Sequence, residues 1–300
     1  MKKFGIVTDS ACDLPSEYRR EKGIDYATMM LNWTDKEGKD HETYADLDWE
    51  VIKSDEFYNI LRSGIRIRTA LVPFESYYNV FEKHLKEGRD VLYVACSSGL
   101  SASQNIAKGI ATEELAKKYP NNRVVVVDTL RAGLAQGMLV MKAQELMEEG
   151  KTIDEVKAII EEIRTEYWEV GFPDTLEYLK RAGRVTGPSA FFGNLFGIKP
   201  ILVFNKDGMN VAKEKARGRK AALERLGELV KEYSENPENE TLYLAHGDIP
   251  DSEIEILKAA VEKHVHFKEI VPMILGPIIG ASSGPGTVIC FFHGKRAKYE

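Results

Sequence analysis

Residues 90–101 read Asp-Val-Leu-Tyr-Val-Ala-Cys-Ser-Ser-Gly-Leu-Ser, an apolar run that ends in a hydroxyl-rich segment. The apolar part, up to Ala95, predicts a buried strand, and the periodicity after Ser101 predicts a helix that runs to about Lys118. This order of strand, polar turn and helix is typical of an α/β fold. Polar groups at such a turn face whatever binds at the end of the strand.

Two further apolar runs, at residues 4–8 and 124–127, predict strands of the same sheet. Each is followed by helical periodicity, so the first half indicates βαβ units and a mainly parallel sheet. The second run is four valines, which favours a central strand. Asp9 directly follows the first strand, and Asp13 is placed to cap the next helix. Right-handed crossovers put the loops after these strands along one edge, where α/β proteins hold their ligands.

The second half has a different pattern. Asp207-Gly208 separates two apolar stretches and predicts a hairpin, hence a mixed sheet with helices. Residues 152–155, Thr-Ile-Asp-Glu, predict a capping box at the start of a helix. We therefore predict an α/β protein with an N-terminal α/β lobe over residues 1–165 and a C-terminal α/β lobe over 166–300. The end of the chain is allowed to pack across both lobes.

Composition excludes several functional classes. The 300 residues are 43% hydrophobic and 29% charged, which is unlike a disordered chain, and no long uncharged apolar run indicates a membrane span. Three scattered cysteines form no disulfide framework and favour a reducing, cytoplasmic location. The net charge of −6 argues against a protein whose main task is binding nucleic acid.

The segment 96–101, which follows the predicted strand at 90–95, suits an anionic ligand, because a helix start offers hydroxyls and backbone N–H groups. Its candidates are Ser97, Ser98 and Ser101, although Ser101 would serve equally as a simple helix cap. Ala95-x-Ser97-x-Gly99 also resembles the nucleophile elbow of hydrolases. With His246 or His293 as its base, this alternative is a serine hydrolase that acts on lipid esters through Ser97.

Other features allow more than one interpretation. Residues 276–286 hold four glycines and two prolines, which predicts a loop. This loop either shapes a ligand site or is a crossover connection that binds no ligand. The phosphate-binding and dinucleotide-binding glycine motifs are missing, so no nucleotide or other cofactor is expected. His264 and His266 have no third ligand nearby in sequence, so no metal site is expected. The basic run 213–220 is a solvated edge or a docking surface for an acidic partner.

Taken together, five segments resemble the DegV family of bacterial fatty-acid-binding proteins. The family's D-S-x-x-D-L-P and S-S-x-L-S-G-T motifs are similar to residues 9–15 and 97–103, and its D-L-x-x-L-x-x-G-G-R motif is similar to residues 174–184. Residues 197–202 and 284–286 complete the resemblance, which covers nearly the whole chain.

The resemblance implies two α/β lobes with a lipid between them and no catalytic residue. It implies a long-chain fatty acid whose carboxylate meets the hydroxyls of Thr69 and Ser101, and a fatty-acid kinase subunit as a partner. The chain departs from the family at Ala70, where a serine is usual, and at Ser282, where a histidine is usual. The head-group set comprises Asp9, Thr69, Ser97, Ser98, Ser101, Arg184, Ser282 and Ser283. The apolar tunnel set, which could equally be ordinary core, comprises Phe191, Phe192, Leu195, Phe196 and Ile198.

Overall fold

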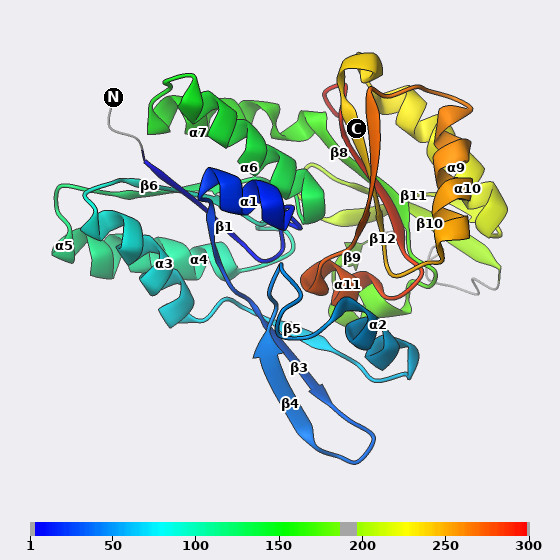
Figure 1. The fold of residues 1–300 in the computed structure, drawn as a ribbon, viewed down its shortest axis with the longest axis horizontal. Coiled ribbons are helices and arrows are strands. Elements are labelled where there is room, and N and C mark those ends of the chain that lie inside the picture. Colours follow the sequence, from blue (N-terminus) through cyan, green and yellow to red (C-terminus); the bar gives the residue numbers. More distant parts are fainter. Residues whose placement is uncertain (1–3, 187–196, 299–300) are drawn as a thin grey trace. The chain divides into compact units, whose positions relative to one another are not determined.

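The structure is a computed structural model that describes residues 4–186 and 197–298. The chain forms two compact units (Figure 1). Unit 1 comprises residues 1–51, 69–164 and 276–278, and unit 2 comprises residues 52–68, 165–275 and 279–300. The units therefore differ from a single division at residue 165, because residues 52–68 group with the C-terminal half and residues 276–278 with the N-terminal half.

Unit 1 is built on a parallel sheet of order β2-β1-β6-β7. The apolar runs dictate its centre, since every residue of β1 (Gly5–Asp9) and β6 (Val91–Ala95) is buried. β2 (Asp25–Ala27) and β7 (Val124–Asp128) form its edges. The prediction that the valine run is a central strand is therefore wrong. Four of the five residues of β7 are only half-buried, and their branched side chains suit an edge strand equally well.

Helices connect these strands. They are α1 (Ser16–Lys22), α3 (Phe74–Lys86), α4 (Ser103–Gly109), the π-helical turn η1 (Ile110–Leu115), α5 (Ala116–Lys118), α6 (Gly133–Glu148) and α7 (Ile153–Ile163). The predicted capping box is confirmed, because Thr152 Oγ1 accepts from the N–H of Glu155 and the Glu155 carboxylate accepts from the N–H of Thr152. A second, three-stranded sheet has the order β4-β3-β5, with β3 (Met30–Thr34) and β4 (Asp40–Tyr44) as a hairpin and β5 (Arg68–Ala70) beside β3.

Unit 2 is built on a mixed seven-stranded sheet of order β13-β12-β14-β8-β10-β11-β9. Its strands are β8 (Tyr167–Phe172), β9 (Val185–Thr186), β10 (Ile198–Phe204), β11 (Asn210–Arg217), β12 (Thr241–His246), β13 (Glu269–Ile274) and β14 (Val288–His293). The predicted hairpin is confirmed as the antiparallel pair β10–β11. The predicted α/β class, with a parallel first sheet and a mixed second sheet, is thus confirmed.

The helices of unit 2 include the pair α9 (Arg219–Tyr233) and α10 (Asp251–Glu262), which lie side by side against the sheet (Figure 1). Side chains from both helices and from β8, β10, β12 and β14 share one apolar core. The remaining helical segments are α2 (Ser54–Arg62), η2 (Arg164–Glu166), α8 (Glu177–Ala182), η4 (Pro237–Asn239) and α11 (Pro277–Ser283). The predicted glycine-rich loop at 276–286 is therefore wrong in part, since its first half is α11.

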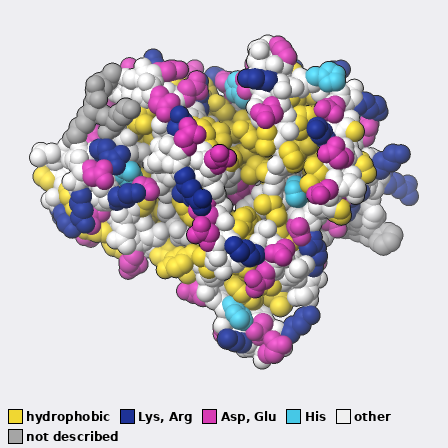
Figure 2. Space-filling model, in the orientation of Figure 1, with side chains coloured by type: hydrophobic (Ala, Val, Ile, Leu, Met, Phe, Trp, Pro, Cys, Tyr) yellow, Lys and Arg dark blue, Asp and Glu magenta, His cyan; other side chains and the backbone are white. Residues whose placement is uncertain are grey.

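Within the described residues, none of the helices combines the length and apolar character that crossing a membrane requires. On the face drawn in Figure 2, acidic and basic side chains alternate over the described surface and no large basic field forms. This distribution agrees with the net charge of −6.

Candidate functional site

Asp9 organises the end of the parallel sheet in unit 1. Its side chain is fully buried at the end of β1. Oδ2 accepts from the Tyr93 hydroxyl at 2.7 Å and from the N–H of Cys96 at 3.0 Å. Oδ1 accepts from the N–H of Ala11 at 3.1 Å and from Gln136 Nε2 at 3.3 Å. Burial raises the pKa of Asp9 although these donors oppose the shift. Its carboxylate therefore joins the segments that follow β1 and β6.

The segment after β6 carries the three serines singled out from the sequence. Ser97 is fully buried, and its Oγ accepts from the N–H of Gly99 at 3.1 Å. Ser98 is exposed, and its N–H donates to Asp128 Oδ1 at 3.2 Å. Ser101 is half-buried, and its Oγ accepts from the N–H of Ser103 at 3.2 Å. Because Ser101 accepts in this bond, its hydroxyl hydrogen stays available for donation to a carboxylate.

Thr69 lies on β5, and the backbone that follows it is tied to the serine segment. Ser103 Oγ accepts a 3.3 Å hydrogen bond from the N–H of Val72. Thr69 is half-buried, whereas Ala70 is exposed. Residues 69–73 and residues 97–103 thus meet through a buried hydroxyl within unit 1. Two of the predicted head-group residues, Thr69 and Ser101, belong to these joined segments.

The two serines of unit 2 lie on α11 and differ in their environment. Ser283 is buried, and its hydroxyl donates to the carbonyl of Ile279 at 2.8 Å. Its own carbonyl accepts from Thr287 Oγ1 at 2.9 Å. The Ser283 hydroxyl therefore serves the helix itself. Ser282 is half-buried on the same helix.

Arg184 stabilises the end of α8. Gly183 adopts the left-handed conformation there, with φ = 71°, and the N–H of Arg184 donates to the carbonyl of Leu179 at 3.1 Å. The Arg184 guanidinium donates to the carbonyl of Ala182.

Of the predicted tunnel residues, Ile198 is half-buried on β10, whereas Phe191, Phe192, Leu195 and Phe196 lie outside the described residues.

The structure gives the hydrolase alternative no support. Ser97 has no exposed surface, and its Oγ accepts a backbone hydrogen bond. His246, in unit 2, lies 3.4 Å by its Nδ1 from the N–H of Ile249, and burial lowers the pKa of its imidazole. His293, also in unit 2, lies 3.1 Å by its Nδ1 from the carboxylate of Glu240. Both imidazoles thus have partners in the C-terminal half.

A surface pocket of about 560 Å³ opens in unit 1 beside Pro73. The only charged side chain among its lining residues in the described part of the chain is the carboxylate of Glu75. A carboxylate repels a second carboxylate, so this pocket does not suit the head group of a fatty acid. The lining consists of Tyr44, Pro73, Glu75, Ser76, Asn79 and Val80.

Sequence reasoning missed three residues that hold the site together. Tyr93 and Gln136 donate to Asp9, and Ser103 joins the two hydroxyl-bearing segments. Tyr93 and Gln136 are polar side chains within otherwise apolar runs of a strand and a helix, and that contrast was the available signal. Buried polar groups in such positions need internal partners.

Comparison with known proteins gives a consistent result. A family model described as "Uncharacterised protein, DegV family" matches residues 3–294. A DegV domain-containing protein of Clostridium perfringens is 36% identical over 294 residues, which is 98% of each chain. The structure is similar to that of a fatty-acid-binding DegV family protein from Thermus thermophilus. That similarity has a TM-score of 0.83 and 30% identity, and covers 98% of this chain and 100% of the other.

A DegV lipid-binding protein of Thermotoga maritima is similar at a TM-score of 0.79 and 27% identity, over 99% of this chain and 100% of that one. The family match extends over nearly the whole length, and the relatives align from end to end. This chain belongs to the DegV family.

Proposed function

We propose that this chain is a cytoplasmic carrier that binds a long-chain fatty acid and holds its carboxylate with the hydroxyls of Thr69 and Ser101. The observation that carries the proposal is the hydrogen bond from the N–H of Val72 to Ser103 Oγ, which joins the segments that bear these two hydroxyls. The Thermus thermophilus relative, a fatty-acid-binding DegV family protein, supports the ligand class. The Thermotoga maritima relative is a DegV lipid-binding protein.

The acyl chain supplies most of the affinity in this proposal. Burying a methylene is worth about 0.8 kcal/mol, so a chain of about fifteen methylenes gains roughly 12 kcal/mol before costs. Association and ordering of the ligand remove a large part of that gain. The carboxylate then fixes the position of the ligand, and the apolar tail is buried in the protein.

The head group has fewer donors here than the family pattern offers. Ala70 removes one hydroxyl, and Ser282 replaces an imidazole with a hydroxyl. A carboxylate bound by two hydroxyls is less fully paired than one that also meets a third donor. We therefore propose that this chain holds the carboxylate less tightly than the family pattern would.

We further propose that the bound acid is presented to a fatty-acid kinase subunit. In that reaction a carboxylate oxygen attacks the γ-phosphorus of ATP, the bond to the β-phosphate oxygen breaks, and acyl phosphate and ADP form. The carrier supplies no catalytic residue. The test is to combine the palmitate-loaded chain, the kinase and ATP, and to trap acyl phosphate with hydroxylamine.

The ligand itself is tested first. Mass spectrometry of an organic extract of the purified protein should show a long-chain fatty acid, and added palmitate or oleate should bind. If no acid co-purifies and neither acid binds, the proposed function is wrong.

The head-group site is tested separately. Thr69→Val and Ser101→Ala should each weaken palmitate binding by about 1–3 kcal/mol, because each leaves a carboxylate oxygen without a donor. Ser63→Ala is the matched control, since the Ser63 hydroxyl donates to the carbonyl of Ile60 on the surface and should leave affinity unchanged. Unchanged affinity in both site variants would show that the head group binds elsewhere.

A further inference from the structure

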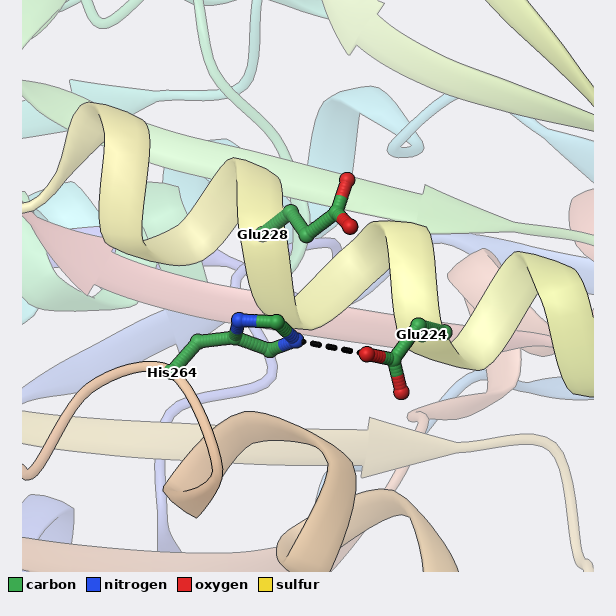
Figure 3. A group of neighbouring side chains, drawn as sticks. All are labelled: Glu224, Glu228 and His264. Carbon is green, nitrogen blue, oxygen red and sulfur yellow. Dashed lines mark hydrogen bonds and ion pairs between the residues drawn. The ribbon is translucent and has the colours of Figure 1, made fainter.

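Three side chains that bind metal ions in other proteins meet where α9 and α10 pack together in unit 2. Glu224 and Glu228 are four residues apart on α9, so they project from the same face of the helix. His264 follows the end of α10 and points its imidazole at Glu224 (Figure 3). His264 Nε2 lies 2.9 Å from Glu224 Oε1. One nitrogen and one oxygen from each carboxylate all lie within 4.8 Å of one another.

Gly227 allows this approach. It lies on α9 between the two glutamates, and a Cβ placed on it would be 2.3 Å from the carbonyl oxygen of Ala260 and 3.1 Å from His264 Cδ2. Only a residue without a side chain lets the backbones of α9 and α10 come this close. The packing of the two helices therefore brings His264 against the turn of α9 that carries both carboxylates.

The groups now paired with the two glutamates can be released. Lys263 donates to Glu224, but its ammonium is 63% exposed and would regain water on leaving. Arg225 contacts Glu228 at 2.7 Å, but it also makes two hydrogen bonds to Glu214, at 2.7 and 2.9 Å. Arg225 therefore keeps a carboxylate partner when Glu228 turns away.

We propose that Glu224, Glu228 and His264 form a Zn²⁺ site that joins the end of α10 to α9. Ligand atoms around tetrahedral Zn²⁺ lie about 3.4 Å apart, given metal–ligand distances near 2.1 Å. The three atoms here lie at most 4.8 Å apart, so the side chains must rotate to bring them to that separation. The imidazole favours Zn²⁺ over Mg²⁺ or Ca²⁺, which prefer oxygen ligands. The fourth position faces solvent, because the two glutamate side chains are 40% and 43% exposed.

The test is a titration of the full chain, freed of metal with a chelator, with Zn²⁺ alone, followed by calorimetry and by thermal unfolding. Co²⁺ serves as a second probe, because a tetrahedral site gives it strong visible absorption. The variants are His264→Ala and Glu228→Gln. His266→Ala is the matched control, because it removes a neighbouring imidazole outside the cluster.

One equivalent of Zn²⁺ should bind the wild-type chain and raise its unfolding temperature, because the ion binds only the folded state. Binding should weaken at least about tenfold in His264→Ala and in Glu228→Gln, and should stay within about twofold in His266→Ala. Loss of Zn²⁺ binding in His266→Ala, or equal binding in His264→Ala and the wild type, would overturn the proposal. So would a Co²⁺ complex without tetrahedral absorption. Circular dichroism verifies that each variant is folded.

Discussion

Two aspartates of the N-terminal motif, four residues apart, have opposite environments. Asp9 and Asp13 are both buried, but four groups donate hydrogen bonds to Asp9, whereas the backbone N–H of Gly276 is the one donor that faces the Asp13 carboxylate within the described residues. Asp13 also adopts the left-handed conformation, with φ = 46°. A sequence motif thus specifies two buried carboxylates with different physical consequences. The prediction that Asp13 caps α1 is wrong, because that helix has no side-chain cap.

Asp9→Asn should destabilise the protein strongly. The amide group places an N–H₂ where an oxygen now accepts from two donors, so buried donors lose their partner. Leaving buried polar groups unpaired costs about 1–3 kcal/mol for each. Urea unfolding should therefore show a loss of about 3 kcal/mol in the free energy of unfolding. The same substitution at exposed Asp207, in the β10–β11 turn, should change it by less than about 0.5 kcal/mol. Equal effects at both positions would contradict the role given to Asp9.

Asp13→Asn should change how stability depends on pH. Burial raises the pKa of Asp13 to about 7 in the folded state, above its unfolded value. The folded protein then binds more protons than the unfolded chain between those two values, so stability falls as pH rises through this interval. The fall is at most about 1.4 kcal/mol per pH unit. It should level off above a pH of about 7.

Asparagine tolerates the left-handed conformation of Asp13 and does not ionise. Urea unfolding of the wild type and of Asp13→Asn at several pH values between 5 and 8 measures the difference. The variant should gain stability relative to the wild type as pH rises. A constant difference across this range would mean that Asp13 does not titrate there.

At the scale of elements, the close approach of α9 and α10 depends on Gly227. Gly227→Ala should destabilise unit 2, because the added carbon would lie 2.3 Å from the carbonyl oxygen of Ala260. Forcing two packed helices apart costs about 1–3 kcal/mol. Gly109→Ala is the matched control. Gly109 is the last residue of α4, and nothing lies within 4 Å of its added Cβ, so helix propensity should make that variant neutral or slightly more stable. Denaturant unfolding of both variants distinguishes the two positions, and equal midpoints would contradict the packing argument.

The sequence predicts an element well where its own residues decide the outcome. The runs that became β1 and β6 are mainly apolar and wholly buried, and Thr152 and Glu155 form a capping box by local chemistry alone. The sequence predicts an element poorly where contacts with neighbouring elements decide its place in the fold. The valines of β7 would suit a centre or an edge, and only the strand order settles which. The glycines within 276–286 suggested a loop, yet Gly280 sits in α11, where its missing side chain makes room for Tyr58.

The candidate site shows the same division. Serines and threonines at strand ends can be found by inspection, but which hydroxyls remain available depends on contacts between distant residues. Ser283 gives its hydroxyl to its own helix, whereas the hydrogen bond at Ser101 leaves the hydroxyl hydrogen available. The glutamates near His264 are about forty residues away in sequence, and only the packing of α9 against α10 brings them together.

At the scale of the whole molecule, a bound fatty acid should raise the unfolding temperature. A ligand that binds only the folded state stabilises it by about 2.7 kcal/mol when its concentration is about 100 times the dissociation constant. Hexadecanol, with the same tail but no carboxylate, should give a smaller shift than palmitate, since the hydroxyl pairs with fewer donors. Ser101→Ala should reduce the palmitate shift and leave the hexadecanol shift nearly unchanged. Thermal unfolding with each ligand measures these differences. Identical shifts for palmitate and hexadecanol in the wild type would show that burial of the tail alone stabilises the complex and that contacts with the carboxylate add nothing.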